Sequence, residues 1–136
     1  SESKKVGGLH IPDPLMERIR GGQCIELRSS TQTRVSWLLR EYEHFLSNPE
    51  SFKEKLSLLT SRYGKEQITK WHEAIDRGDF EGLVEELLIM HYDPSYQSSI
   101  IRNFPSYRED HFVKLEDDSD EAFAKTAKDL ITKLGL

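Results

Sequence analysis

Residues with the chemistry of a phosphate or magnesium site crowd the start of the chain. The segment Glu2–Pro12 contains a carboxylate, two lysines, a histidine and a glycine pair within one short loop. In an α/β sheet, ligands bind in the loops that follow the strands. Glu2 could hold a magnesium-bound water there, and Lys4 could contact a phosphate. The residues alone leave open the alternative that this segment is an ordinary solvated end.

A second segment that could contact a ligand has two tyrosines on either side of an Asp-Pro pair. It reads Tyr-Asp-Pro-Ser-Tyr over residues 92–96. Because a proline ring disfavours helical backbone in the residue before it, the pair predicts a loop or a short helix over residues 92–108. A turn that caps the preceding helix is the interpretation that the residues themselves favour.

The sequence contains no complete motif for metal binding or for covalent catalysis. Residues 72–76 approach the helical zinc-protease pattern, but Asp76 stands where the second histidine is required. The five histidines share no ligand spacing, so no metal site is predicted. Cys24 is assigned to packing, because it falls inside a predicted strand and a reactive thiolate favours a helix N-terminus.

The sequence also lacks a complete phosphate-binding loop and the aromatic-basic pattern of a base-stacking surface. A P-loop needs a glycine, four further residues and then Gly-Lys-Ser/Thr. Gly64 and Lys65 match part of this motif, but Leu59 and Glu66 replace the first glycine and the hydroxyl residue. The two tryptophans lie in no alternation of aromatic and basic residues, so we expect them to pack between helices.

Composition is typical of a small globular protein of a reducing compartment. The 136 residues are 36% hydrophobic with a mean hydropathy of −0.64, so we expect one core and no membrane span. A single cysteine and the lack of a secretory signal predict a cytoplasmic protein. Residues 1–40 hold seven basic and four acidic side chains, a net charge of +3, which leaves −8 for the remainder. A basic first third could face a phosphate-bearing ligand, although a mixture of solvated charges explains the same count.

Hydrophobic periodicity predicts two short strands among several helices. The strands are expected over residues 23–28 and 111–115. Apolar stripes at helical spacing predict helices over about residues 14–20, 31–46, 52–63, 68–75, 80–91 and 123–134. Asp13 is the expected N-cap of the first helix, and Ser29 or Ser30 that of the second. Residues 1–10 are expected to form a loop.

Two strands are normally too few for an independently stable sheet. We therefore expect an α/β fold that is predominantly helical and whose sheet is completed by upstream strands absent from this chain. Its expected parts are an α/β portion with the ligand loop over residues 1–46, a helical insertion over 47–91, and a loop, short strand and C-terminal helix over 92–136. Whether these form a single domain or a fragment of one stays open.

Three segments resemble the C-terminal part of tRNA 2-selenouridine synthase. They are the opening Glu-Ser-Lys-Lys-Val-Gly-Gly-Leu-His-Ile-Pro, the strand-to-helix passage over residues 23–42, and Leu-Leu-Ile-Met-His-Tyr-Asp-Pro-Ser-Tyr over residues 87–96. Members of that family resemble a fusion of a rhodanese-like domain, which bears a catalytic cysteine, with a P-loop domain. The resemblance implies the later half of a P-loop NTPase-like parallel sheet with a helical insertion. The family's catalytic cysteine has no counterpart here, so Cys24 does not inherit its role.

The resemblance also places the family's site residues on this chain. Glu2 falls on an acidic stretch, Lys4 on the basic position that follows it, Gly7 on a glycine and His10 on a histidine. Arg34 falls on the arginine of the helix after the next strand. Three further residues match a tyrosine-aspartate-proline motif whose role stays open: Tyr92, Asp93 and Tyr96.

A reaction and its partners follow from the same resemblance. The wobble 2-thiouridine of certain tRNAs is S-geranylated by geranyl diphosphate, and selenium from selenophosphate then displaces the geranylthio group. Lys4 and Arg34 would contact the phosphates of these two co-substrates, with an ordinary surface ion pair as the alternative for Arg34. No covalently bound cofactor is implied, although magnesium could assist. The implied partners are tRNA and a rhodanese and P-loop portion on the same or a separate chain, without which this piece is expected to be inactive.

Two other functions remain open. Residues 31–91 could form a helical platform that binds tRNA or a partner protein and holds no reactive group, or they could form a lid like that of a nucleotide kinase. A tRNA platform would lose affinity as salt rises, because binding releases counterions from the nucleic acid.

Overall fold

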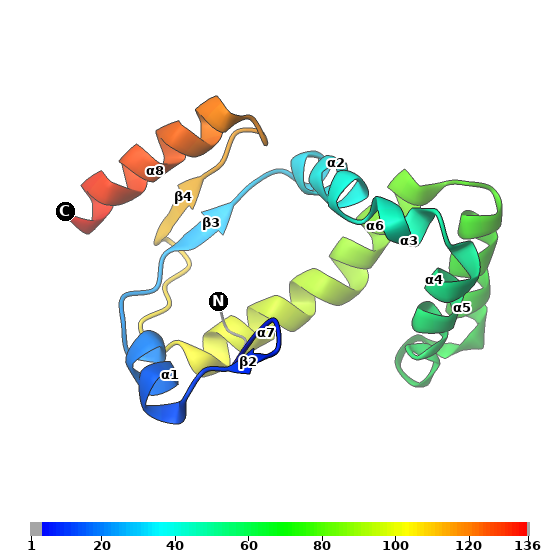
Figure 1. The fold of residues 1–136 in the computed structure, drawn as a ribbon, viewed down its shortest axis with the longest axis horizontal. Helices are drawn as coiled ribbons and strands as arrows, with labels where there is room; N and C mark the ends of the chain where they lie inside the picture. The colour runs from blue at the N-terminus through cyan, green and yellow to red at the C-terminus, as the bar shows by residue number, and fades with distance from the viewer. Residues whose placement is uncertain (1–3, 136) are drawn as a thin grey trace. The chain divides into compact units, whose positions relative to one another are not determined.

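The computed structural model describes residues 4–135 of the 136-residue chain, apart from the side chains of residues 44 and 45. It is mostly helical and contains a small parallel sheet of two strands (Figure 1). The chain divides into two compact units: unit 1 comprises residues 1–29 and 92–136, and unit 2 comprises residues 30–91.

Unit 1 combines a hairpin, a parallel strand pair and helices. Its elements are β1 (Lys5–Val6), β2 (Leu9–His10), α1 (Asp13–Arg20), β3 (Glu26–Arg28), α7 (Asp93–Asn103), β4 (Phe112–Lys114) and α8 (Asp120–Leu134). The two predicted strands are confirmed as β3 and β4, each shorter than the sequence pattern suggests. The predicted first and last helices are confirmed as α1 and α8.

Residues 5–10 form a hairpin where the sequence predicted a loop. β1 and β2 pair antiparallel, with Lys5 opposite His10. Gly7 and Gly8 connect the strands, and Gly7 has a φ of 61°. A two-residue hairpin turn needs such a positive φ, which glycine adopts without steric strain. The loop prediction is wrong because each strand has only two residues and so shows no periodicity.

The N-cap of α1 is Pro12 rather than the predicted Asp13. Pro12 occupies the N-cap position, and Asp13 is already the first helical residue. The Asp13 carboxylate accepts a hydrogen bond from Lys4 instead of capping the helix, so the N-cap prediction is wrong. Pro14 lies in the first turn, where its missing N–H costs no intrahelical bond.

The parallel strand pair carries Leu27 and Val113 on one face, and its charged side chains share the other face with Phe112. Leu27 of β3 lies opposite Val113 of β4. Val113 and Leu115 are buried, and the hydroxyl of Thr126 in α8 donates to the Lys114 carbonyl at 3.2 Å. α8 therefore covers β4, and its first turn is capped by a serine side chain.

Unit 2 is helical, and its first helix begins where the sequence predicted. Its elements are α2 (Thr31–Glu41), α3 (Glu43–Leu46), α4 (Pro49–Ser57), α5 (Thr60–Asp76) and α6 (Phe80–Leu87), followed by the π-helical turn η1 (Leu88–Tyr92). The Ser30 hydroxyl accepts a hydrogen bond from the Thr33 N–H, which confirms Ser30 as the N-cap. The predicted helix over residues 31–46 is interrupted at Tyr42. Gly64 ends a helical stretch as predicted, because its backbone, with a φ of 81°, is not helical and divides α5 into two helical parts.

The core of unit 2 surrounds one tryptophan. Trp71 is fully buried, and α4, α5 and α6 contribute the apolar side chains around it. Its indole Nε1 donates to the Glu86 carboxylate at 3.1 Å, so the buried N–H is not left without an acceptor. The prediction that both tryptophans pack between helices is confirmed for Trp71 but wrong for Trp37, whose surface is 46% exposed.

The largest difference from the sequence prediction follows α6. Residues 92–103 are helical, because η1 leads directly into α7, whereas the Asp-Pro pair predicted a loop or a short helix from residue 92. A wider π-turn changes the hydrogen-bond register of the helix, and Pro94 then lies in the first turn of α7. The proline is thus placed where a missing N–H is tolerated.

Candidate functional site

The hairpin holds Lys4 against the first turn of α1. The Lys4 Nζ lies 2.7 Å from a carboxylate oxygen of Asp13, and the Ile11 N–H donates to the Lys4 carbonyl at 2.7 Å. Both charged side chains remain largely exposed to solvent. The hydrogen bond from Lys4 and its positive charge lower the pKa of Asp13, so this carboxylate is ionised at neutral pH.

A small hollow lies beside this ion pair. Its volume is about 200 Å³, and its lining is Lys4, Asp13, Met16, Glu17 and Arg20. The hollow is large enough for a phosphate group, and two cationic side chains face it together with two carboxylates. A phosphate that binds to Lys4 must therefore compete with Asp13.

Two other predicted site residues, Gly7 and His10, lie in the same hairpin segment as Lys4. A third, Glu2, lies outside the described part of the chain. Gly7 forms the hairpin turn, and a Cβ built there would meet no atom within 4 Å, so its role in the structure is conformational. His10 is exposed in β2. Glu2 precedes the described residues, and its predicted magnesium role therefore stays a prediction.

Arg34 lies in the first turn of α2, in unit 2. Its neighbour Val35 is buried, and Arg34 itself is partly buried, as expected for a stem that packs along the helix. The predicted site residues therefore belong to two units, with Lys4, Gly7 and His10 in unit 1.

The tyrosine-aspartate-proline motif forms the start of α7. The rings of Tyr92 and Tyr96 stack with their centroids 6.4 Å apart, and 45% and 53% of their surfaces are exposed. Asp93 lies in the first helical turn, where a carboxylate complements the helix dipole. The motif therefore presents two parallel aromatic rings to solvent rather than the predicted turn.

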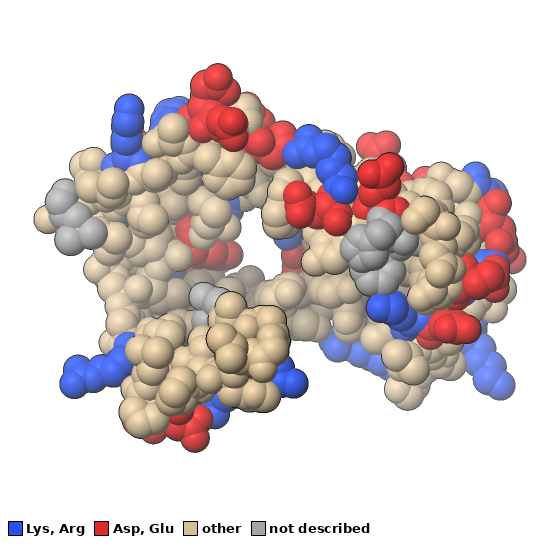
Figure 2. Space-filling view, viewed as in Figure 1, with Lys and Arg blue, Asp and Glu red and all other residues tan. Residues whose placement is uncertain are grey.

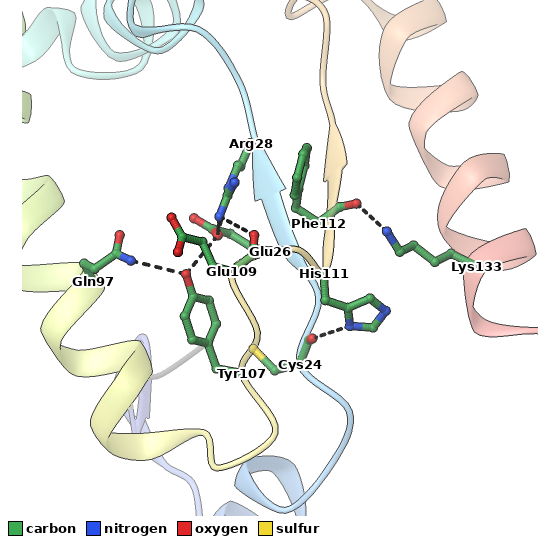
Figure 3. A network of polar contacts seen from close by, with 9 residues as sticks. All are labelled: Cys24, Glu26, Arg28, Gln97, Tyr107, Glu109, His111, Phe112 and Lys133. Carbon is green, nitrogen blue, oxygen red and sulfur yellow. Dashed lines mark hydrogen bonds and ion pairs between the residues drawn. The ribbon is translucent and has the colours of Figure 1, made fainter.

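A polar network on β3 was not predicted from the sequence (Figure 3). The Arg28 guanidinium donates from Nε and Nη2 to Glu26 at 2.9 and 2.6 Å, and from Nη2 to the Glu109 carbonyl at 2.9 Å. The same group lies 4.3 Å from the ring centroid of Phe112. The Tyr107 hydroxyl donates to Glu26 at 3.4 Å. The one signal in the sequence was the spacing of Glu26 and Arg28, which places both side chains on the same face of a strand.

The guanidinium in this network is already satisfied by protein groups. Glu26 raises the pKa of Arg28 by accepting its hydrogen bonds, so the guanidinium keeps its positive charge. Gln97 in α7 donates to the Tyr107 hydroxyl at 3.2 Å and extends the network to that helix. The arrangement ties residues 107–109 to β3, which is a structural role rather than a catalytic one.

Cys24 lies before β3, outside the strand that the sequence predicted for it, and its backbone is hydrogen-bonded through both its N–H and its carbonyl. His111 Nδ1 lies 3.0 Å from the Cys24 carbonyl oxygen (Figure 3). The Cys24 N–H donates to the Ser106 hydroxyl at 3.0 Å. Burial, followed by the negative charge of Glu26, raises the pKa of the Cys24 thiol. A raised pKa lowers the thiolate fraction, so the environment does not activate this sulfur as a nucleophile.

On one face of the molecule, basic and acidic side chains are mixed rather than segregated (Figure 2). On the face shown in Figure 2, Lys and Arg side chains lie interspersed with Asp and Glu side chains. Among residues 4–135, no group of three or more His, Cys, Asp or Glu side chains is arranged to hold a metal ion. None of the described helices combines the length and the apolar character needed to cross a membrane.

Comparison with known proteins identifies no relative. No protein-family model matches the chain, no curated protein matches it, and no solved structure matches it.

Proposed function

We propose that the chain is the later portion of a P-loop domain in a tRNA-modifying transferase of the selenouridine synthase kind. The observation that carries the proposal is the parallel pairing of β3 with β4. Parallel strands occur almost only in larger α/β sheets that helices cover on both faces. Unit 2, residues 30–91, falls in the sequence between these strands, as a helical insertion would.

The basic hairpin supplies the chemistry that such an enzyme needs from this portion. Geranyl diphosphate and selenophosphate are both phosphorylated donors, and a positive charge near the leaving group stabilises the negative charge that develops there. Lys4 is exposed at the rim of a hollow of phosphate size, and its ion-pair partner Asp13 is exposed as well. Arg34 is the second proposed phosphate contact, and Glu2 and His10 the polar groups that accompany Lys4.

The proposal includes partners and a location. A rhodanese-like domain would supply the catalytic cysteine, and a preceding P-loop portion would supply the phosphate-binding loop, on the same or a separate chain. The tRNA substrate and the soluble donors place the protein in the cytoplasm. Magnesium could assist at Glu2. By itself this chain would bind ligands but not transfer selenium.

The rate of tRNA selenation, measured in an enzyme that contains the complete P-loop domain, tests the proposal. Lys4→Ala is expected to lower the rate of selenation by about 100- to 1000-fold, the range for loss of one charge-stabilising donor. Lys5→Ala is the matched control, because it removes the same charge from the next residue of the hairpin. Arg34→Ala should also lower turnover without unfolding the protein. Equal rates for the Lys4 and Lys5 variants would remove Lys4 from the site.

One observation favours a second candidate, a non-catalytic helical module that binds tRNA or a protein. Unit 2 has its own core around the fully buried Trp71, so it is built as an independent packing unit. A tRNA platform predicts an affinity that falls steeply as salt rises, whereas a donor pocket predicts a higher melting temperature with geranyl diphosphate. The two measurements together separate the candidates.

A further inference from the structure

One edge of β3 has free backbone hydrogen-bonding groups. The even-numbered residues bond toward β4 and the segment before it: Cys24 to Ser106 and His111, Glu26 to His111, and Arg28 to Leu115. Backbone groups of successive strand residues face opposite edges. The N–H and C=O groups of Ile25 and Leu27 therefore face away from β4, and neither residue makes a backbone hydrogen bond to another described residue.

An apolar hollow accompanies this edge. Its volume is about 560 Å³, and six apolar side chains contribute to its lining: Ile19, Ile25, Leu27, Tyr96, Ile100 and Phe104. The last three are four residues apart along α7 and the residue that follows it, so they share one helix face. The only charged lining residue is Glu26, whose carboxylate is held by Arg28. The hollow thus suits uncharged side chains.

Apolar side chains next to this edge are exposed to solvent, whereas those of a parallel sheet are normally buried. Leu27 is 54% exposed although its partner in β4, Val113, is buried, and α7 has no buried residue. Parallel sheets are normally buried on both faces, and an open strand edge recruits further strands. Free donors and acceptors that alternate with apolar side chains fit an extended backbone better than any compact ligand.

We propose that the edge formed by Ile25 and Leu27 receives a further β-strand, parallel to β3, whose uncharged side chains fill the hollow against α7. This inference rests on the proposed function, because it assigns the strand to the phosphate-binding portion of the same sheet. A second copy of the chain would fit this edge less well. Its own β3 would be the added strand, and the charged Glu26 and Arg28 beside Leu27 do not suit a hollow with almost no charged lining.

Residue-resolved amide hydrogen exchange tests the site. The chain alone is compared with a fusion that carries, on a flexible Gly/Ser linker, a strand of about six alternating valine and threonine residues. Linkage raises the effective concentration of the strand, so a weak pairing becomes measurable. The matched control fusion has a proline at the centre of that strand, which removes a pairing N–H. The valine-threonine fusion is expected to slow exchange at Ile25 and Leu27 by about tenfold or more, and the proline fusion is not.

Two outcomes would overturn the proposal. Equal exchange rates at Ile25 and Leu27 in both fusions would show that the edge does not accept a strand. Protection that grows with protein concentration in the unfused chain would assign the edge to a second copy instead. Exchange does not depend on any donor, so a chain that fails to bind geranyl diphosphate yet protects Leu27 would refute the proposed function and keep the strand site.

Discussion

The hydroxyl of Tyr63 lies 2.9 Å from Nδ1 of His91. It also donates to the carbonyl of Met90 at 3.0 Å, in the π-helical turn that precedes α7. In a continuous α-helix this carbonyl would accept the N–H of the residue four positions later, but that residue is Pro94, which has none. Tyr63 of α5 thus supplies a donor where the sequence of the helix lacks one.

Tyr63→Phe is therefore expected to destabilise unit 2. It removes the donor to the Met90 carbonyl and the partner of His91 while it keeps the ring that contacts Trp71 edge-on. A loss of about 0.5–1.5 kcal/mol in the free energy of unfolding is expected, the usual net contribution of a hydrogen bond. Urea denaturation measures it. Tyr96→Phe is the control, because its exposed hydroxyl bonds to no described residue, and an equal loss there would contradict the assignment.

The same pair predicts a pH dependence of stability. Burial, followed by the positive charge of Arg62, lowers the pKa of His91 below 6.5 in the folded state. The unfolded chain then binds more protons at this residue, so this contribution to stability is complete above pH 6.5 and falls as the pH drops from there toward the folded pKa. Denaturation between pH 5 and 8 should show this slope, and His91→Asn should reduce it. An unchanged slope in that variant would assign the effect to other groups.

Local sequence patterns predicted the elements whose signals are complete within a few residues. The cap at Ser30, the strand around Leu27 and the acidic start of α8 belong to this class. The helix through Pro94 could not be predicted, because the rule for the residue before a proline is local. The group that donates to the Met90 carbonyl comes from Tyr63, a residue of a different helix.

The candidate site shows the same limit. Spacing alone brought Lys4, Gly7 and His10 into one segment, and the hairpin keeps them there. The sequence did not indicate that Asp13 pairs with Lys4 instead of capping α1. Pro12 occupies the N-cap position, and the helix begins without a side-chain cap. The network of Arg28 was also hidden, since Tyr107 and Glu109 reach β3 only through the pairing of β3 with β4.

Cys24 is expected to react slowly with alkylating agents. Its thiol pKa is raised by burial and by Glu26, so the folded protein holds less thiolate than the unfolded chain at the same pH. The rate of modification by iodoacetamide at pH 8 should increase several-fold when urea unfolds the protein. A native thiol that reacts faster than the unfolded one would contradict the packing role and reopen a chemical one.

Arg28→Lys tests whether the network on β3 stabilises unit 1. A lysine cannot reproduce the two hydrogen bonds to Glu26, the bond to the Glu109 carbonyl and the contact with the Phe112 ring at once. We expect the free energy of unfolding to fall by about 1–2 kcal/mol, the usual contribution of hydrogen bonds to a charged group.

Arg108→Lys is the matched control for that variant. Arg108 also pairs with a carboxylate two residues away, Asp110, but 71% of each side chain is exposed. Exposed ion pairs contribute little because water screens them, so this change should cost clearly less stability than Arg28→Lys. Urea denaturation followed by circular dichroism compares the two variants. Equal losses would mean that Arg28 contributes only a surface ion pair and that β3 is held to residues 107–109 by the backbone pairing with β4 alone.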